Sequence, residues 1–198
     1  MRSTPQEEFW AGEFGTTYTQ RNRGDWSARV PFWRSIVDAT RPRSILEVGC
    51  NRGNNLKALR DVDPSITLYG CDINLDAIEE AHDADLHVVE ASVFELGREW
   101  PVGGFDLVFT VGVLIHIAPD DLHQAMANII GASARYVLAV EYPAEQETEI
   151  EYRGHSERLW KRPFGDLYRA QGLKLVSKGE APAEAFDRCA WWLLEKGA

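Results

Sequence analysis

Residues 44–53, Ser-Ile-Leu-Glu-Val-Gly-Cys-Asn-Arg-Gly, place a short apolar run directly before a turn that contains two glycines. Residues 44–48 favour a buried β-strand, although Glu47 interrupts their apolar character. Gly49 and Gly53 let the backbone turn sharply and approach a ligand closely. Residues 54–60 then return to helical spacing. This strand–turn–helix unit predicts an α/β fold with a mostly parallel sheet, in which such a turn binds nucleotide-like ligands.

The glycine turn differs from the dinucleotide-binding fingerprint in a way that indicates the charge of its ligand. Asn51 stands where that fingerprint requires a glycine, and Glu47 would be a poor neighbour for a pyrophosphate. A carboxylate at this place suits a ligand that carries positive charge. S-adenosylmethionine fits, because it has a sulfonium, an ammonium and no phosphate. The spacing Glu-x-Gly-x-x-x-Gly resembles motif I of the class I S-adenosylmethionine-dependent methyltransferases, and an ordinary tight turn is the alternative.

Length, composition and charge set the bounds of the prediction. A chain of 198 residues that is 44% hydrophobic and 26% charged predicts a single globular domain, residues 1–198. We expect a cytoplasmic protein, since neither a membrane-spanning run nor a secretion leader is evident. The three cysteines are widely spaced, so neither disulfides nor a metal site is indicated. The net charge of −10 opposes a nucleic-acid partner and favours a small-molecule acceptor.

Further segments alternate between strand and helix patterns. The predicted strands are residues 66–71, 86–89, 105–109, 136–140, 173–177 and 190–195. The predicted helices include residues around 32–37 and 74–82, one that begins at Pro119 and stops at Gly131, and residues 159–170. This alternation indicates a parallel sheet with helices on both faces, and its closing strand pair is compatible with an antiparallel edge.

Two polar positions after predicted strands suit the ribose and adenine of such a cofactor. Asp72 follows the second strand, where an acidic side chain can accept hydrogen bonds from both ribose hydroxyls. Its alternative role is to cap the following helix. Ser92 and Val93 follow the third strand, where a hydroxyl and a backbone N–H could bind adenine. For Ser92 a simple turn role is equally compatible with the sequence.

The first 25 residues and His116 are candidates for roles at the transfer site. Residues 1–25 are aromatic and polar, and they predict either a lid over the cofactor or a terminal arm packed on the core. In the lid reading, Tyr18 or Arg21 meets the cofactor's carboxylate. His116 lies beyond the fourth strand, where it could accept a proton from an attacking group or serve a structural role.

A polar loop at residues 143–160 follows the fifth strand. Its segment Glu151-Tyr152-Arg153-Gly154-His155 combines charged and aromatic side chains with a glycine hinge. Such a loop could form a wall of the acceptor pocket or merely connect elements through solvent.

Over nearly its full length the chain resembles the pseudaminic-acid-biosynthesis-associated methyltransferases. The motifs that carry this resemblance are Phe14-Gly15-x-x-Tyr18-x-x-Arg21-Asn22, Ile45-Leu46-Glu47-Val48-Gly49, residues 112–117 (Gly-Val-Leu-Ile-His-Ile), Glu141-Tyr142 and Tyr152-Arg153-Gly154-His155. The resemblance implies a Rossmann-like seven-stranded sheet with an antiparallel last strand. It strengthens the lid and pocket readings. We therefore expect cofactor contacts at Asn51, Gly53, Ile73 and Val111, acceptor contacts at Glu141, Tyr142, Tyr152 and Arg153, and a base at His116 or His155.

The sequence therefore predicts methyl transfer from S-adenosylmethionine to an oxygen or nitrogen of a small polar metabolite, such as a sugar-derived or natural-product intermediate. Two other classes of function are weighed against it. A non-catalytic adenosylmethionine-binding pathway protein would keep the cofactor residues but would be indifferent to His116 and His155. A nicotinamide-dependent oxidoreductase is disfavoured by Glu47 and Asn51. The acceptor and the oligomeric state are left open by the sequence.

Overall fold

A seven-stranded sheet forms the centre of the protein, for which the computed structural model describes residues 3–100 and 102–197. In sheet order the strands are β3 (Val88–Glu90), β2 (Thr67–Asp72), β1 (Ser44–Val48), β4 (Phe105–Val111), β5 (Ser133–Glu141), β9 (Ala190–Glu195) and β8 (Lys174–Glu180). The first five are parallel, whereas β9 runs antiparallel to both β5 and β8. This confirms the predicted sheet with its antiparallel last strand. Residues 1–2 of the predicted lid segment lie outside the described residues.

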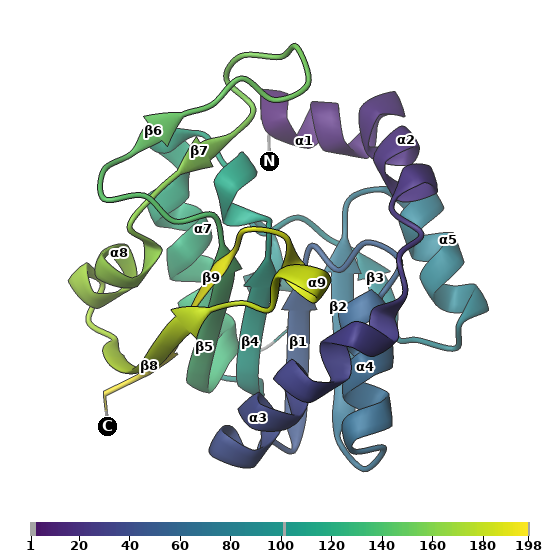
Figure 1. Ribbon diagram of the computed structural model, residues 1–198, viewed down its shortest axis with the longest axis vertical. Coiled ribbons are helices and arrows are strands. Elements are labelled where there is room, and N and C mark those ends of the chain that lie inside the picture. The colour runs from purple at the N-terminus through teal and green to yellow at the C-terminus, as the bar shows by residue number, and fades with distance from the viewer. Residues whose placement is uncertain (1–2, 101, 198) are drawn as a thin grey trace.

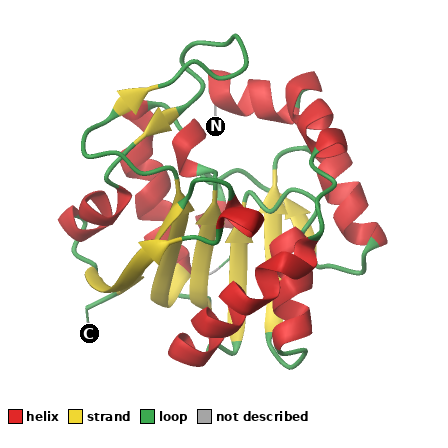
Figure 2. Ribbon diagram, in the orientation of Figure 1, coloured by secondary structure: helices red, strands yellow, loops and turns green. Residues whose placement is uncertain are grey.

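Helices cover both faces of this sheet (Figures 1 and 2). On one face α3 (Val30–Thr40) and α4 (Asn54–Val62) pack against alternate strand residues such as Ile45 and Leu107. On the other face α6 (Leu96–Glu99), α7 (Pro119–Ala132) and α8 (Phe164–Ala170) pack against Leu46 and Val108. Because the central strands are buried on both sides, they read as continuous apolar runs in the sequence.

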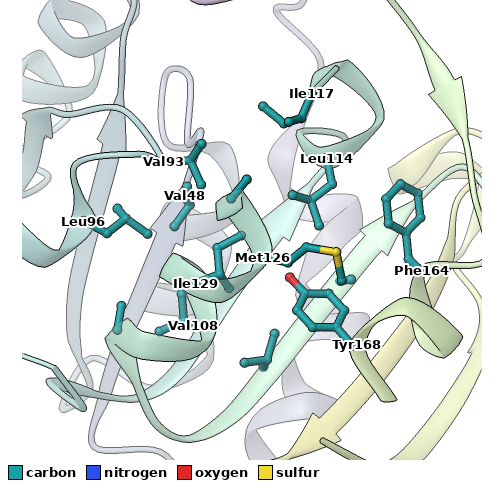
Figure 3. Packing of buried hydrophobic residues seen from close by; sticks show 14 of the residues in the cluster. Val48, Val93, Leu96, Val108, Leu114, Ile117, Met126, Ile129, Phe164 and Tyr168 are labelled. Atoms are coloured by element: carbon teal, nitrogen blue, oxygen red, sulfur yellow. The ribbon is translucent and has the colours of Figure 1, made fainter. Parts of the chain in front are cut away.

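The face of the sheet that α7 covers holds the largest apolar cluster of the described residues (Figure 3). Met126 and Ile129 of α7 lie against Val108 of the sheet, and Phe164 and Tyr168 of α8 close the cluster on one side. Fully burying an aliphatic or aromatic side chain of this size contributes about 1.5–3 kcal/mol. This packing fixes α7 and the ends of β4 and β5, from which the site is built.

Local signals explain where several helices begin. Thr4 and Glu7 form a reciprocal capping box at α1 (Pro5–Ala11), which is followed by α2 (Glu13–Arg21). Asn74 caps α5 (Leu75–Asp83) by accepting a hydrogen bond from the Ala77 N–H. The alternative role of Asp72 as that cap is therefore wrong. The helix α7 continues through Gly131 and ends at Ala132.

The segment between β5 and α8 differs from the sequence prediction. Residues 159–163 do not open a helix, because β7 (Trp160–Lys161) pairs with β6 (Thr148–Glu149) in a short hairpin. The helix α8 begins only at Phe164, after Pro163. Three further short helices complete the fold: η1 (Trp26–Arg29), η2 (Leu114–His116) and α9 (Ala183–Phe186).

Two features of the described residues limit the kind of site to expect. None of their helices combines the length and apolar character that crossing a membrane requires. Within residues 3–100 and 102–197, no group of three or more His, Cys, Asp or Glu side chains is placed to hold a metal ion.

Candidate ligand-binding site

A cavity of about 460 Å³ lies at the carboxyl ends of β1, β2 and β4. From β1 the chain passes to β2 and β3 on one side, and it then crosses to β4 on the other side of β1, so this is the point where the strand order reverses. Residues of α1 and α2, which cross above these strand ends in Figure 1, complete the lining. The volume falls within the range of pockets that enclose small organic ligands.

The glycine turn brings backbone close to the cavity. Gly49 has a φ of +71°, and a Cβ atom there would stand 2.5 Å from Cγ2 of Val113. Gly53 has a φ of +73° and packs against Leu86, outside the cavity lining. Asn51 lines the cavity, and its side chain donates a 2.7 Å hydrogen bond to Oγ1 of Thr19 in α2. Gly49 therefore shapes the cavity directly, whereas Gly53 shapes the turn.

Glu47 presents a buried carboxyl group to the cavity with one oxygen unused. The residue is 1% exposed, and its Oε1 accepts a 2.6 Å hydrogen bond from Nδ2 of Asn55. Its Oε2 has no hydrogen-bond partner among the described residues. Burial raises the pKa of Glu47 to about 8. A buried acceptor without a partner is costly, and a donor group on a ligand would satisfy it.

Asp72 is held in place by three backbone N–H groups. Its Oδ2 accepts from Asn51 at 2.7 Å, and its Oδ1 accepts from Ile73 at 2.8 Å and Asn74 at 2.9 Å. A carboxylate offers about four acceptor positions, so about one is left for a ligand hydroxyl. Asp72 and Ile73 both line the cavity.

The adenine-side candidates also lie at the cavity. Ser92, Val93 and Val111 all belong to its lining. The Ser92 hydroxyl accepts a 3.1 Å hydrogen bond from the Phe94 N–H, so Ser92 does stabilise the turn after β3. The hydroxyl keeps a donor for a ligand, and the two roles of Ser92 are compatible.

The N-terminal segment contributes a different arginine from the one predicted. Tyr18 lines the cavity, and burial raises its pKa. Arg21 is exposed and lies outside the lining, where its guanidinium stacks 5.4 Å from the centre of the Tyr18 ring. Arg29 of η1 lines the cavity instead and donates a 2.7 Å hydrogen bond to Oδ1 of Asn55. No sequence signal singled out Arg29, because its place depends on how η1 packs against α4.

His116 lies in η2 and lines the cavity. Its Nδ1 lies 2.6 Å from the carbonyl oxygen of Arg158, and its ring is 4.4 Å from that of Trp10 and 5.1 Å from that of Tyr152. Burial lowers the pKa of His116 to about 4, so the imidazole is neutral at pH 7. With a proton on Nδ1 donated to the carbonyl, Nε2 is left as an acceptor.

Two of the four predicted acceptor contacts have other partners in the structure. Glu141 is fully buried, and its carboxylate accepts hydrogen bonds from the N–H groups of residues 113, 114 and 115. Glu141 therefore shapes the η2 turn that carries His116, and it does not line the cavity. The Tyr142 hydroxyl donates a 2.6 Å hydrogen bond to Asp187, also away from the cavity.

The predicted acceptor loop packs against the N-terminal helices. His155 is exposed, with its ring 5.0 Å from that of Phe9 in α1, and it lies outside the cavity lining. The ring of Tyr152 packs against the ring of His116. Arg153 is exposed, and its guanidinium lies over the Tyr152 ring. The structure therefore brings together His116 and the cofactor candidates, whereas Arg21, Gly53, His155 and the four acceptor candidates stay outside the lining.

Part of the sequence is similar to known proteins. Residues 46–134 match a family described as "Methyltransferase domain". A human tRNA N(3)-cytidine methyltransferase is 34% identical over 94 residues, which cover 43% of this chain and 33% of the relative. The chain thus aligns with about a third of the length of this curated relative.

Solved structures share the whole fold at low sequence identity. A Burkholderia thailandensis 1,6-didemethyltoxoflavin-N1-methyltransferase, with bound S-adenosylhomocysteine, is 17% identical with a TM-score of 0.76, covering 100% of this chain and 92% of that one. A Synechocystis magnesium protoporphyrin IX methyltransferase with bound S-adenosylmethionine is 13% identical with a TM-score of 0.71, covering all of both chains. The chain therefore has the fold of these S-adenosylmethionine-dependent methyltransferases, and its residues 46–134 match a methyltransferase-domain family.

Proposed function

We propose that this protein binds S-adenosylmethionine in the cavity at the end of β1 and transfers its methyl group to an oxygen or nitrogen of a small polar metabolite. The observation that carries the proposal is the unused Oε2 of Glu47, buried at the glycine turn of a methyltransferase fold. An acceptor oxygen without a partner suits a ligand ammonium, which supplies only donors.

The lining residues divide into three groups by the part of the cofactor they would hold. Glu47 offers a carboxyl group for the ammonium of its amino-acid end, and Arg29 offers a guanidinium for the carboxylate. Asp72 offers its remaining acceptor position to a ribose hydroxyl. Ile73, Ser92 and Val93 offer apolar surface and polar atoms for the adenine. Tyr18 and the other lining residues of α1 and α2 would cover the bound cofactor as a lid.

When bound, S-adenosylmethionine supplies a methyl group that is already activated by the sulfonium. The protein therefore mainly has to align the acceptor and exclude water, which the covering helices α1 and α2 can do. His116 holds a neutral Nε2 at the cavity, and it would accept the proton of an attacking hydroxyl or amine. Glu141 would support this step indirectly, because it fixes the turn that carries His116.

The charge of the chain supports a small acceptor over a nucleic acid. The net charge of −10 opposes binding to a phosphate backbone, although the human relative is named as a tRNA methyltransferase. Within that class, the resemblance to the pseudaminic-acid-associated family supports a sugar-derived acceptor. The neighbour from Burkholderia, a 1,6-didemethyltoxoflavin-N1-methyltransferase, supports transfer to a nitrogen of a small molecule.

The test is transfer of a labelled methyl group. The protein is incubated with methyl-labelled S-adenosylmethionine and either pooled small polar metabolites or total tRNA, and label in the products is counted. Label in a small-molecule fraction, lost in His116→Ala while S-adenosylhomocysteine still binds, supports the proposal. Label in tRNA alone would refute the acceptor class, and binding of the cofactor without any transfer would favour the non-catalytic alternative.

A further inference from the structure

The side-chain amide of Asn55 joins a half-buried cation, Arg29, to a buried carboxyl group, Glu47, at one end of the cavity. Asn55 is 4% exposed, and its Oδ1 accepts from Nη1 of Arg29 at 2.7 Å and from Nε1 of Trp33 at 3.2 Å. Arginine and tryptophan side chains only donate hydrogen bonds, so the amide oxygen must face them. The amide nitrogen therefore faces Glu47, to which it donates at 2.6 Å. The orientation of the amide is determined by its partners.

We propose that Asn55 is a positioning residue, which couples Glu47 and Arg29 into one receptor for a zwitterionic amino-acid group, and that binding of this group expels one proton from the site. This inference rests on the proposed function, because the amino-acid group is that of S-adenosylmethionine or S-adenosylhomocysteine. The Asn55 amide holds the carboxyl group of Glu47 at one end and the guanidinium of Arg29 at the other. A ligand with adjacent ammonium and carboxylate groups requires such a pair.

The proton expulsion follows from which oxygen of Glu47 is occupied. Oε1 already accepts from Asn55, so a proton on the carboxyl group resides on Oε2, the atom that has no described partner. A ligand ammonium has only donors to offer. The oxygen of an O–H group is a weak acceptor, so a charge-assisted hydrogen bond to the ammonium forms at this place only after the pair loses one proton.

The surroundings of Glu47 decide whether that proton is present before binding. Burial dominates and raises the pKa of Glu47 to about 8. The hydrogen bond from Asn55 and the charge of Arg29 oppose the rise, and Asp72 adds to it. The thiols of Cys50 and Cys71 also face this region, and burial raises the pKa of both, so they stay neutral. At pH 7 the empty site therefore holds the proton in roughly nine molecules of ten.

The experiment compares two ligands that differ only at the amino-acid end. S-adenosylhomocysteine and 5′-methylthioadenosine share the nucleoside and the thioether, but the second lacks the amino acid. Each is titrated calorimetrically at pH 7 in two buffers with different ionisation enthalpies, phosphate and Tris. We expect S-adenosylhomocysteine to release about 0.9 proton per site, and methylthioadenosine to release none.

Three variants separate the role of Asn55 from a general effect on the fold. Asn55→Asp keeps the shape and the acceptor for Arg29 but replaces the donor to Glu47, so we expect at least a ten-fold loss of S-adenosylhomocysteine affinity. Its affinity for methylthioadenosine should change less than two-fold. Glu47→Gln should abolish the proton release. Gln146→Glu, at an exposed position outside the cavity lining, makes the same change in charge and should behave as wild type.

The outcomes distinguish this inference from the proposed function. Equal losses of affinity for both ligands in Asn55→Asp, or S-adenosylhomocysteine binding without proton release, would overturn the inference and leave the function standing. The thermal transition of each variant is recorded beside the titrations. A wild-type protein that binds neither ligand would overturn the proposed function, and the inference with it.

Discussion

Glu47 should reduce the stability of the empty protein at high pH, because it is placed for a ligand and not for the fold. Its carboxyl group is 1% exposed and has a hydrogen bond on one oxygen only. Burial raises the pKa of Glu47 to about 8 in the folded protein, whereas an ordinary glutamate in the unfolded chain titrates at about 4.3. The substitution Glu47→Gln keeps the shape of the side chain and removes the ionisation.

The sign and size of the effect follow from the two pKa values. Between pH 4.3 and 8 the folded state holds a proton that the unfolded state has lost, so the free energy of unfolding falls as the pH rises through this window. The fall is complete above the folded pKa. Between pH 5 and pH 9 the wild type should therefore lose about 4 kcal/mol more than Glu47→Gln. Other titrating groups cancel, because both proteins share them.

The measurement is urea denaturation of both proteins at pH 5, 7 and 9, without ligand. We expect Glu47→Gln to gain stability over the wild type progressively, with the largest difference at pH 9. A difference that stays constant from pH 5 to pH 9 would refute the reasoning, because it would mean that Glu47 ionises as freely in the folded protein as in the unfolded one.

Three further substitutions test other parts of the structure. Gly49→Ala places a Cβ against Val113 at a φ of +71°, so we expect a loss of about 1–3 kcal/mol in denaturation together with weaker S-adenosylhomocysteine binding, and unchanged binding would contradict the close approach. Glu141→Gln replaces an acceptor by a donor opposite a buried N–H, which should cost about 1–3 kcal/mol in thermal unfolding at pH 8, and a neutral effect would refute its role in η2. Ile129→Ala opens a cavity under α7 and should cost about 2–5 kcal/mol in denaturation while ligand affinity is kept, whereas reduced affinity would show that α7 packing reaches the site.

The central sheet and the glycine turn could be predicted because their signals are local. Residues 44–53 form the strand and turn as expected, with positive φ at both Gly49 and Gly53. Asp72 and Ser92 follow strands that end at the same edge, so their meeting at the cavity follows from parallel topology. What the residues themselves could not reveal is that three backbone N–H groups already occupy Asp72.

The errors arise where tertiary contacts decide the outcome. Residues 159–163 have a local pattern compatible with a helix, but strand pairing of Trp160 with Glu149 and the full burial of Arg162 impose a hairpin. Arg29 enters the cavity in place of Arg21 because η1 packs beside α4, at Asn55. These contacts join residues of different segments, so no motif within one segment predicts them.

The central claim is that the cavity at the end of β1 binds S-adenosylmethionine and excludes dinucleotides. Calorimetric titration of the wild-type protein at pH 7 with S-adenosylhomocysteine, and separately with NAD⁺, tests it most directly. We predict a dissociation constant on the order of micromolar for S-adenosylhomocysteine and no measurable binding of NAD⁺. Binding of NAD⁺, or an absence of heat and of thermal stabilisation with S-adenosylhomocysteine, would contradict the account.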